Sequence, residues 1–160
     1  MNTTNKFLLS AIIAIASTLG FTSCDDDGDT TPPSINLISP TNGEKIQIGK
    51  VIHFEVELSD DEMLKSYKVE IHNNIEDPHG HEMALKASEV TDKNYFSFQK
   101  TWNISDKRNT TPHEHIDIPE GVTAGEYHLM VYCTDAAGNE SHVASKIILT
   151  NEEIEDEHDH

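Results

Sequence analysis

Apolar and polar residues alternate with a period of two through most of this 160-residue chain. Between residues 52 and 58 every second side chain is apolar, and His53, Glu55 and Glu57 stand between them. The same alternation returns in residues 96–104, 127–133 and 143–149. Because successive side chains of a strand point to opposite faces, this pattern indicates half-buried β-strands and not helices.

Turn-forming residues separate these runs. They include Pro40-Thr41-Asn42-Gly43, Ser59-Asp60-Asp61, Glu120-Gly121 and Ala137-Gly138-Asn139. We therefore expect strands near 35–39, 50–59, 65–73, 94–104, 113–118, 125–134 and 141–150. Such spacing predicts an all-β domain over residues 34–150, a single antiparallel β-sandwich of about seven strands. Trp102 and Phe98 are expected in its core, and Cys133 has the inward parity of a buried thiol.

The N-terminus has a different composition. Lys6 precedes an apolar stretch of about 13 residues, shorter than the roughly 20 that a helix needs to cross a bilayer, so residues 1–23 are expected to be a signal peptide. Phe21-Thr22-Ser23-Cys24 resembles a bacterial lipobox, which implies a lipid on Cys24 and a membrane anchor. The acidic run after it resembles the signal of surface-exposed Bacteroidetes lipoproteins, which implies an outer-membrane protein facing the exterior.

Acidic residues dominate the chain. Asp and Glu number 29 against 11 Lys and Arg, for a net charge of −18. Such a surface repels nucleic acid and attracts divalent cations, so we expect no nucleic-acid partner. Residues 24–33 are expected to form an acidic tether and residues 151–160 a disordered acidic tail. With Cys24 lipidated, Cys133 is the one remaining thiol, and no internal disulfide can form.

Part of the sequence is similar to known β-sandwich families. Ile116–Pro119, Ala124–Tyr127 and Thr134–Asn139 resemble the second half of a fibronectin-III or bacterial Ig-like domain. This resemblance implies that Tyr127 is a corner tyrosine and that residues 135–139 form a turn. The chain also resembles an uncharacterised family of His-rich Bacteroidetes lipoproteins with an Ig-like domain, a domain of unknown function. The matching positions are Cys24, residues 79–81, 113–119, 125–128 and 135–139, and they imply no known activity.

The ten histidines are patterned. Three His-x-His pairs occur, at residues 79–81, 113–115 and 158–160. In an extended segment residues i and i+2 share a face, and imidazole is the commonest protein ligand of zinc and copper. One pole of an Ig-type sandwich gathers the loop after strand 65–73, the end of strand 113–118 and the start of strand 125–134. We therefore expect zinc or copper there, bound by His79, His81, His115, His128 and, less centrally, His113.

Further ligands could join this site. They are His72, Asp117 and the tail residues His158 and His160, whereas His53 and His142 read as solvated surface residues. An additional strand within residues 83–90 would reverse the face that strand 113–118 presents. The expected function is capture or delivery of a transition metal by a surface lipoprotein, with an outer-membrane transporter as a candidate partner.

Other interpretations stay open. Asp60, Asp61 and Asp135 could bind calcium at the opposite pole, although Asp residues in turns commonly bond to backbone amides instead. A second function class is a non-catalytic adhesion, glycan-binding or protein-binding module. The sequence contains no recognisable nucleophile–base motif, so we do not expect an enzyme.

Overall fold

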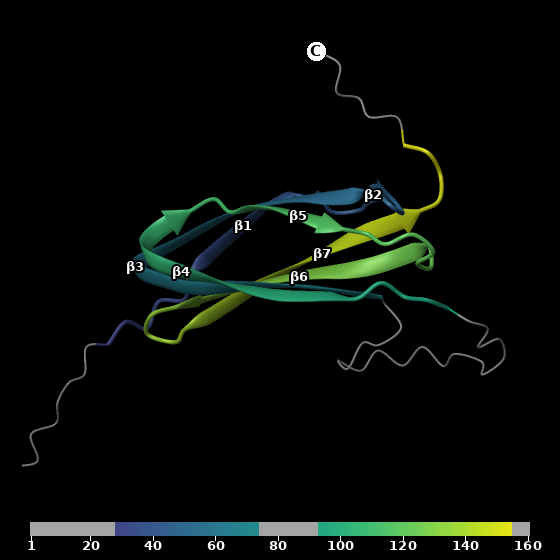
Figure 1. Cartoon of the computed structure of the whole chain (residues 1–160). Coiled ribbons are helices and arrows are strands. Elements are labelled where there is room, and N and C mark those ends of the chain that lie inside the picture. The colour runs from purple at the N-terminus through teal and green to yellow at the C-terminus, as the bar shows by residue number, and fades with distance from the viewer. Residues whose placement is uncertain (1–27, 74–92, 155–160) are drawn as a thin grey trace, which may run out of the picture.

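The computed structural model describes residues 28–73 and 93–154, which form strands, turns and loops with no helix among them (Figure 1). None of the described residues therefore belongs to a helix long and apolar enough to cross a membrane. The seven strands are β1 (Ser34–Ser39), β2 (Glu44–Gln47), β3 (Val51–Asn73), β4 (Phe98–Thr110), β5 (His113–Asp117), β6 (Gly125–Asp135) and β7 (Glu140–Thr150).

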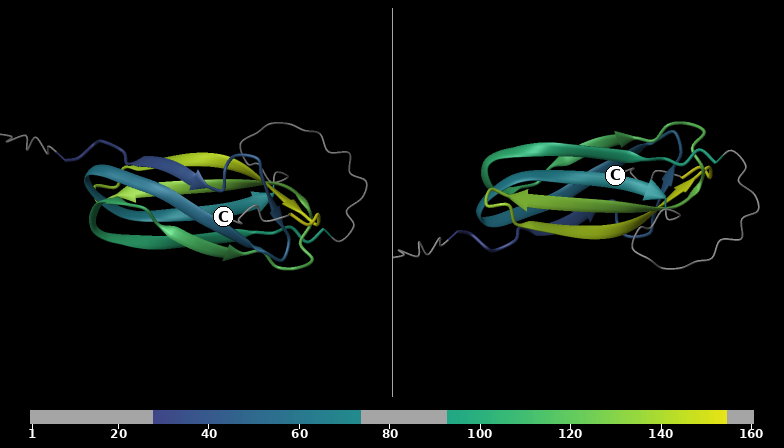
Figure 2. Two further views of the ribbon diagram at one scale, coloured as in Figure 1. Left: turned by 90° about the horizontal axis from the view of Figure 1, so that it is seen from above. Right: turned by 90° about the horizontal axis from the view of Figure 1, so that it is seen from below.

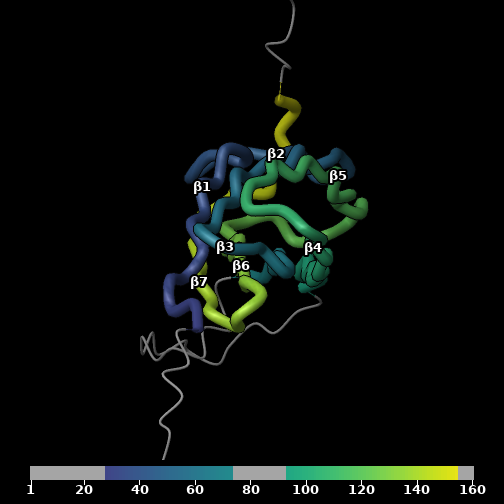
Figure 3. The backbone as a smooth tube through the Cα atoms, turned by 90° about the vertical axis from the view of Figure 1, so that its left-hand side faces the viewer, coloured from purple at the N-terminus to yellow at the C-terminus, as the bar shows by residue number. Residues whose placement is uncertain are grey.

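The long strand β3 belongs to both layers of the sandwich. Its first half pairs antiparallel with β1 and β5, and these strands make the first layer. Its second half pairs with β4 and β6, β6 pairs with β7, and β2 lies parallel to β7, which completes the second layer. The crossing falls between Ser59 and Leu64, where the pairing with β4 is irregular. Figures 2 and 3 show the two layers from other sides.

The all-β sandwich expected from the alternation is confirmed, with differences in its elements. The expected strands 50–59 and 65–73 are continuous as β3, because the polar segment between them stays extended as the chain changes layer. Strand β4 begins later than expected and runs on to Thr110. The four-residue strand β2 has no counterpart in the expectation, since its run Glu44–Gln47 holds one apolar residue.

The core fills with the inward-facing residues of β3, β6 and β7. Phe54, Val56, Leu129 and Leu149 are among its fully buried members. Cys133 is also fully buried, as expected, and burial raises the pKa of its thiol to about 12. Its thiolate is therefore scarce at neutral pH, which suits a packing role.

Trp102 and Phe98 do not lie within this core but only flank it. Both are half-buried and pack against the core residues from β4. Trp102 stacks on the ring of Tyr67, with centroids 4.9 Å apart, and the Lys100 ammonium lies over the Trp102 ring, 4.7 Å from its centroid. Among the described strands β4 pairs only with β3, so it is an edge strand whose side chains stay open to solvent on one side.

Tyr127 closes one corner of the sandwich, as the fibronectin-like resemblance implies. Its hydroxyl donates to the Thr123 carbonyl at 2.6 Å and accepts a bond from the Phe96 amide at 3.2 Å. These bonds tie the segment before β4 to the loop before β6. Burial is the main reason that the pKa of Tyr127 is raised.

Different elements meet at the two ends of the sandwich. One end, the arm pole, holds the N-terminal segment 28–33 (the arm), which lies beside the β3 crossing and the β6–β7 turn (Figure 1). At the opposite end, the far pole, β3 begins and ends, β5 ends and β6 begins. Asn139 donates its side-chain amide to the Asp29 carbonyl at 3.0 Å, and the Ser141 hydroxyl bonds to the Pro33 carbonyl. The segment expected as a tether over residues 24–33 is thus held by the domain from Asp29 onward.

Candidate metal centre

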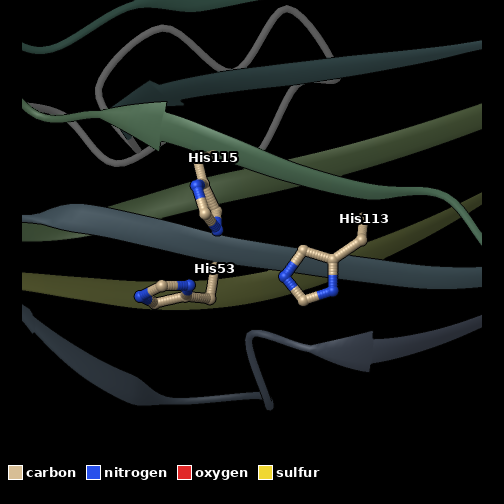
Figure 4. Close-up of side chains that lie close together, drawn as sticks. All are labelled: His53, His113 and His115. Carbon is tan, nitrogen blue, oxygen red and sulfur yellow. The ribbon is translucent and has the colours of Figure 1, made fainter.

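Three histidines gather on the outer face of the first layer. His53 of β3 lies directly opposite His115 of β5, and His113 stands two residues earlier on β5, diagonal to His53. Alternation turns all three side chains away from the core, whose buried neighbours in the two strands include Ile52, Phe54 and Ile116. All three imidazoles are exposed, and Figure 4 shows them close together.

The spacing of the three rings suits a shared ion. Ring centroids are 4.8 Å apart for His53 and His115, 5.5 Å for His113 and His115, and 6.5 Å for His53 and His113. One nitrogen from each ring lies within 4.8 Å of the other two. Zinc–nitrogen bonds of about 2.0–2.1 Å place neighbouring nitrogens about 3.3 Å apart in a tetrahedral site. Rotation of exposed side chains can close this remaining gap.

The strands beneath the cluster are held firmly. Between the two outward histidines of β5, Glu114 points inward and accepts a hydrogen bond from the Tyr67 hydroxyl at 3.1 Å. Burial, followed by this bond and the Glu114 charge, raises the pKa of Tyr67. On the other side of β3, the Ser39 hydroxyl donates to the His53 carbonyl at 2.6 Å. These contacts fix the backbone from which the imidazoles project.

The structure groups the expected histidine ligands differently from the sequence interpretation. His115 has His53 and His113 as neighbours, whereas His128 of β6 pairs with His72 on the second layer, with ring centroids 5.7 Å apart. His115 and His128 both lie towards the far pole, but the outer faces of two stacked layers point away from each other. The expectation that His115 and His128 bind the same ion is therefore wrong.

His53 was missed because its partner comes from another strand. The signal was available: in an Ig-type sandwich strand 50–59 pairs antiparallel with strand 113–118, so outward residues of one oppose outward residues of the other. Asp117 is exposed on the same face of β5 but is not part of the three-histidine group. Outside the described residues lie Cys24, His79, His81, the segment 83–90, His158 and His160.

The acidic residues at the arm pole also form a different group from the one expected. Asp60 and Asp61 come together with Asp29 of the arm, one carboxylate oxygen from each lying within 4.8 Å of the others, and Asp135 is not in this group. Oδ1 of Asp60 accepts bonds from the amides of Glu62 and Met63, while its Oδ2 is buried without a hydrogen-bond partner. Three carboxylates are donors of the kind that calcium takes.

Asp135 instead stabilises the β6–β7 turn, which corrects its expected place among calcium ligands. Its side chain is fully buried. Oδ1 accepts bonds from the amides of Gly138 and Asn139 at 2.6 and 2.8 Å, and Oδ2 accepts one from the Asn139 side chain at 2.7 Å. Burial acts to raise the pKa of Asp135, but the bonds from Asn139 and the turn amides outweigh it, so that the pKa is lowered.

Replacing Asp135 by Ala is expected to lower the free energy of unfolding by about 1–3 kcal/mol at neutral pH, because three donors of the turn lose their acceptor. A lowered pKa in the folded state means that this contribution is present above the ordinary carboxyl pKa and is lost as pH falls through the folded value. Urea unfolding of both proteins between pH 7 and pH 2 measures the difference. A gap that widens on acidification would contradict this assignment.

Comparisons with known proteins place the chain in context. A search of curated proteins found no match. Among solved structures, the fibronectin(III)-like modules of Clostridium thermocellum CbhA are 14% identical with a TM-score of 0.45, over 76% of this chain and 100% of that one. OgpA of Akkermansia muciniphila is 15% identical with a TM-score of 0.46, over 74% of this chain and 29% of its own.

A DUF4466 family protein from Parabacteroides merdae is 14% identical with a TM-score of 0.46, over 76% of this chain and 46% of its own. At these identities and TM-scores the likenesses assign no function to the chain. A family model described as a domain of unknown function matches residues 22–150, most of the sequence. The chain therefore belongs to the family of the domain of unknown function DUF4625.

Proposed function

We propose that this protein binds a divalent transition metal ion, zinc or copper, through His53, His113 and His115. The observation that carries the proposal is the meeting of three imidazole nitrogens within 4.8 Å on the adjacent strands β3 and β5. Nitrogen donors favour zinc, copper and nickel over calcium or magnesium. The strongly acidic chain adds a long-range attraction for cations.

The arrangement suits capture and delivery. Three protein ligands leave one position of a tetrahedral ion open to water or to an incoming donor. Since all three imidazoles are exposed, a second protein can reach the ion directly. Lipid on Cys24 would hold the domain at the outer membrane with its sandwich outside the cell, and an outer-membrane transporter is the kind of partner that could supply the incoming ligand.

Calorimetric titration of zinc and of copper tests the proposal, on leaderless protein purified without an affinity tag. For zinc we expect one tight site, whose affinity falls as the buffer is acidified, because a protonated imidazole has no lone pair for metal. His53→Ala alone should weaken zinc binding by at least about tenfold. Mutating a residue that only hydrogen-bonds to a metal ligand already costs about tenfold or more in metal affinity, and a direct ligand should cost no less.

His142→Ala is the matched control, since His142 is also an exposed histidine of an outer strand face but stands outside the three-histidine group. It should bind zinc like the parent protein. Equal affinity of the His53→Ala variant and the parent would refute the proposed ligand set. An absence of binding tighter than millimolar in the parent would leave a protein-binding or glycan-binding module as the better hypothesis.

A further inference from the structure

A second pair of histidines lies on the outer face of the second layer. His72 of β3 and His128 of β6 are direct cross-strand neighbours, with ring centroids 5.7 Å apart. Both are half-buried, so their rings have less freedom than the exposed histidines of the first layer. Facing side chains of this kind on adjacent strands can present two nitrogens to one ion.

One ring of this pair is already oriented for metal binding. Nδ1 of His72 lies 3.1 Å from the carbonyl oxygen of Asn73. A carbonyl oxygen can only accept, so Nδ1 carries the proton and the lone pair remains on Nε2. A backbone carbonyl on the far nitrogen is the arrangement by which proteins fix the tautomer of a metal-binding histidine.

A sulfur donor stands beside the pair. Met130 follows His128 by two residues on β6, shares its outward face and is the diagonal neighbour of His72 across the strands. Diagonal positions remain within reach of a long, flexible side chain such as Met. Thioether sulfur is a soft ligand that selects Cu(I) and binds zinc poorly.

The charged groups around the pair are already paired with each other. Lys146 of β7 lies opposite His128, but its ammonium is held by Glu126 at 3.0 Å. Glu70, opposite Met130, accepts a bond from Lys68 at 2.8 Å. Among the described neighbours of this face, no unpaired positive charge therefore repels a cation at His72 and His128. No unpaired carboxylate among them competes with nitrogen and sulfur as a ligand.

We propose that His72, His128 and Met130 form a second metal site that is selective for copper, Cu(I) above all. The two layers then differ in metal preference: three imidazoles on the first accept zinc or copper, whereas two imidazoles and a thioether on the second discriminate against zinc. This site does not depend on the function proposed for the first layer, because the two share no ligand.

Copper binding in a background without the first site tests this proposal. The leaderless protein carrying His53→Ala, His113→Ala and His115→Ala is titrated with Cu(I) under anaerobic conditions and, separately, with zinc. Two further proteins add His128→Ala or Met130→Leu to that background. His142→Ala in the same background is the matched control, because His142 is another outward histidine of the second layer.

We expect the background protein to keep a Cu(I) site that is lost with His128→Ala, is weakened about tenfold or more with Met130→Leu, and is unchanged with His142→Ala. X-ray absorption should show copper–sulfur scattering that disappears with Met130→Leu. Circular dichroism and the melting temperature verify that each variant is folded. Cu(I) binding that survives His128→Ala, or zinc binding as tight as copper binding, would overturn the proposal.

These outcomes are separable from those of the first site. If the three-histidine hypothesis alone is wrong, the parent and the background protein bind zinc equally, while the effects of His128→Ala and Met130→Leu on Cu(I) persist. If the second site alone is wrong, zinc binding is lost in the background protein. Adding His128→Ala or Met130→Leu then leaves Cu(I) binding unchanged.

Discussion

Phe54→Ala is expected to lower the free energy of unfolding by about 3–5 kcal/mol, a large part of the roughly 5–15 kcal/mol that holds such a domain together. Phe54 is fully buried in β3, near the start of the strand that joins both layers. Removing its ring leaves a cavity that the strands on either side cannot close, because both are fixed by backbone pairing. Urea unfolding with an unchanged m-value is the measurement.

Trp102→Ala should destabilise the domain by clearly less, although tryptophan is the larger side chain. Trp102 is half-buried on an edge strand, so part of its surface is exposed to water before the substitution. Thr101→Ala, on the outer face of the same strand, is the control and should change stability by about 0.5 kcal/mol or less. Equal costs for Trp102→Ala and Phe54→Ala would mean that β4 is not an open edge.

Zinc is expected to raise the melting temperature of the parent protein and not that of the His53→Ala, His113→Ala, His115→Ala variant. An ion that binds only the folded state adds about 2.7 kcal/mol at a concentration of 100 Kd, which corresponds to a shift on the order of 10 °C for a domain of this size. The ion would join β3 to β5, and β5 pairs with no other strand among those described.

Differential scanning calorimetry at several zinc concentrations measures this shift, with His142→Ala as the control that should retain it. The triple variant alters only exposed side chains, so its melting temperature without metal should stay close to that of the parent. A zinc-dependent shift of undiminished size in the triple variant would place the site among other ligands.

The period-two alternation was sufficient to predict the fold class, because inward parity alone separates Phe54, Leu129 and Cys133 from their polar neighbours. It could not predict which strands would lie at an edge. Trp102 has the inward parity of a core residue, and only the pairing of β4 with a single neighbour leaves it partly exposed. That information lies in tertiary arrangement and not in local pattern.

The candidate site also contains residues that local pattern predicts and one that only the tertiary arrangement reveals. His113 and His115 were found because an i, i+2 spacing puts two imidazoles on one face of a strand, whatever the fold. His53 stands alone in its own segment, and it gains its meaning from the register of β3 against β5. The same register argument separates His128 from His115, because it assigns each to a different layer.

The attachment of the arm at Asp29 has a consequence for how the protein would stand on a membrane. Only five residue steps separate Asp29 from Cys24, a reach of at most about 18 Å, whereas an 11-residue strand such as β7 extends over about 36 Å. If Cys24 carries the proposed lipid, the segment from Cys24 to Asp29 is shorter than the domain. The sandwich therefore cannot turn over to bring its far pole to the bilayer. With the domain standing on its arm pole, both histidine faces would point parallel to the membrane surface, and a partner would approach them from the side.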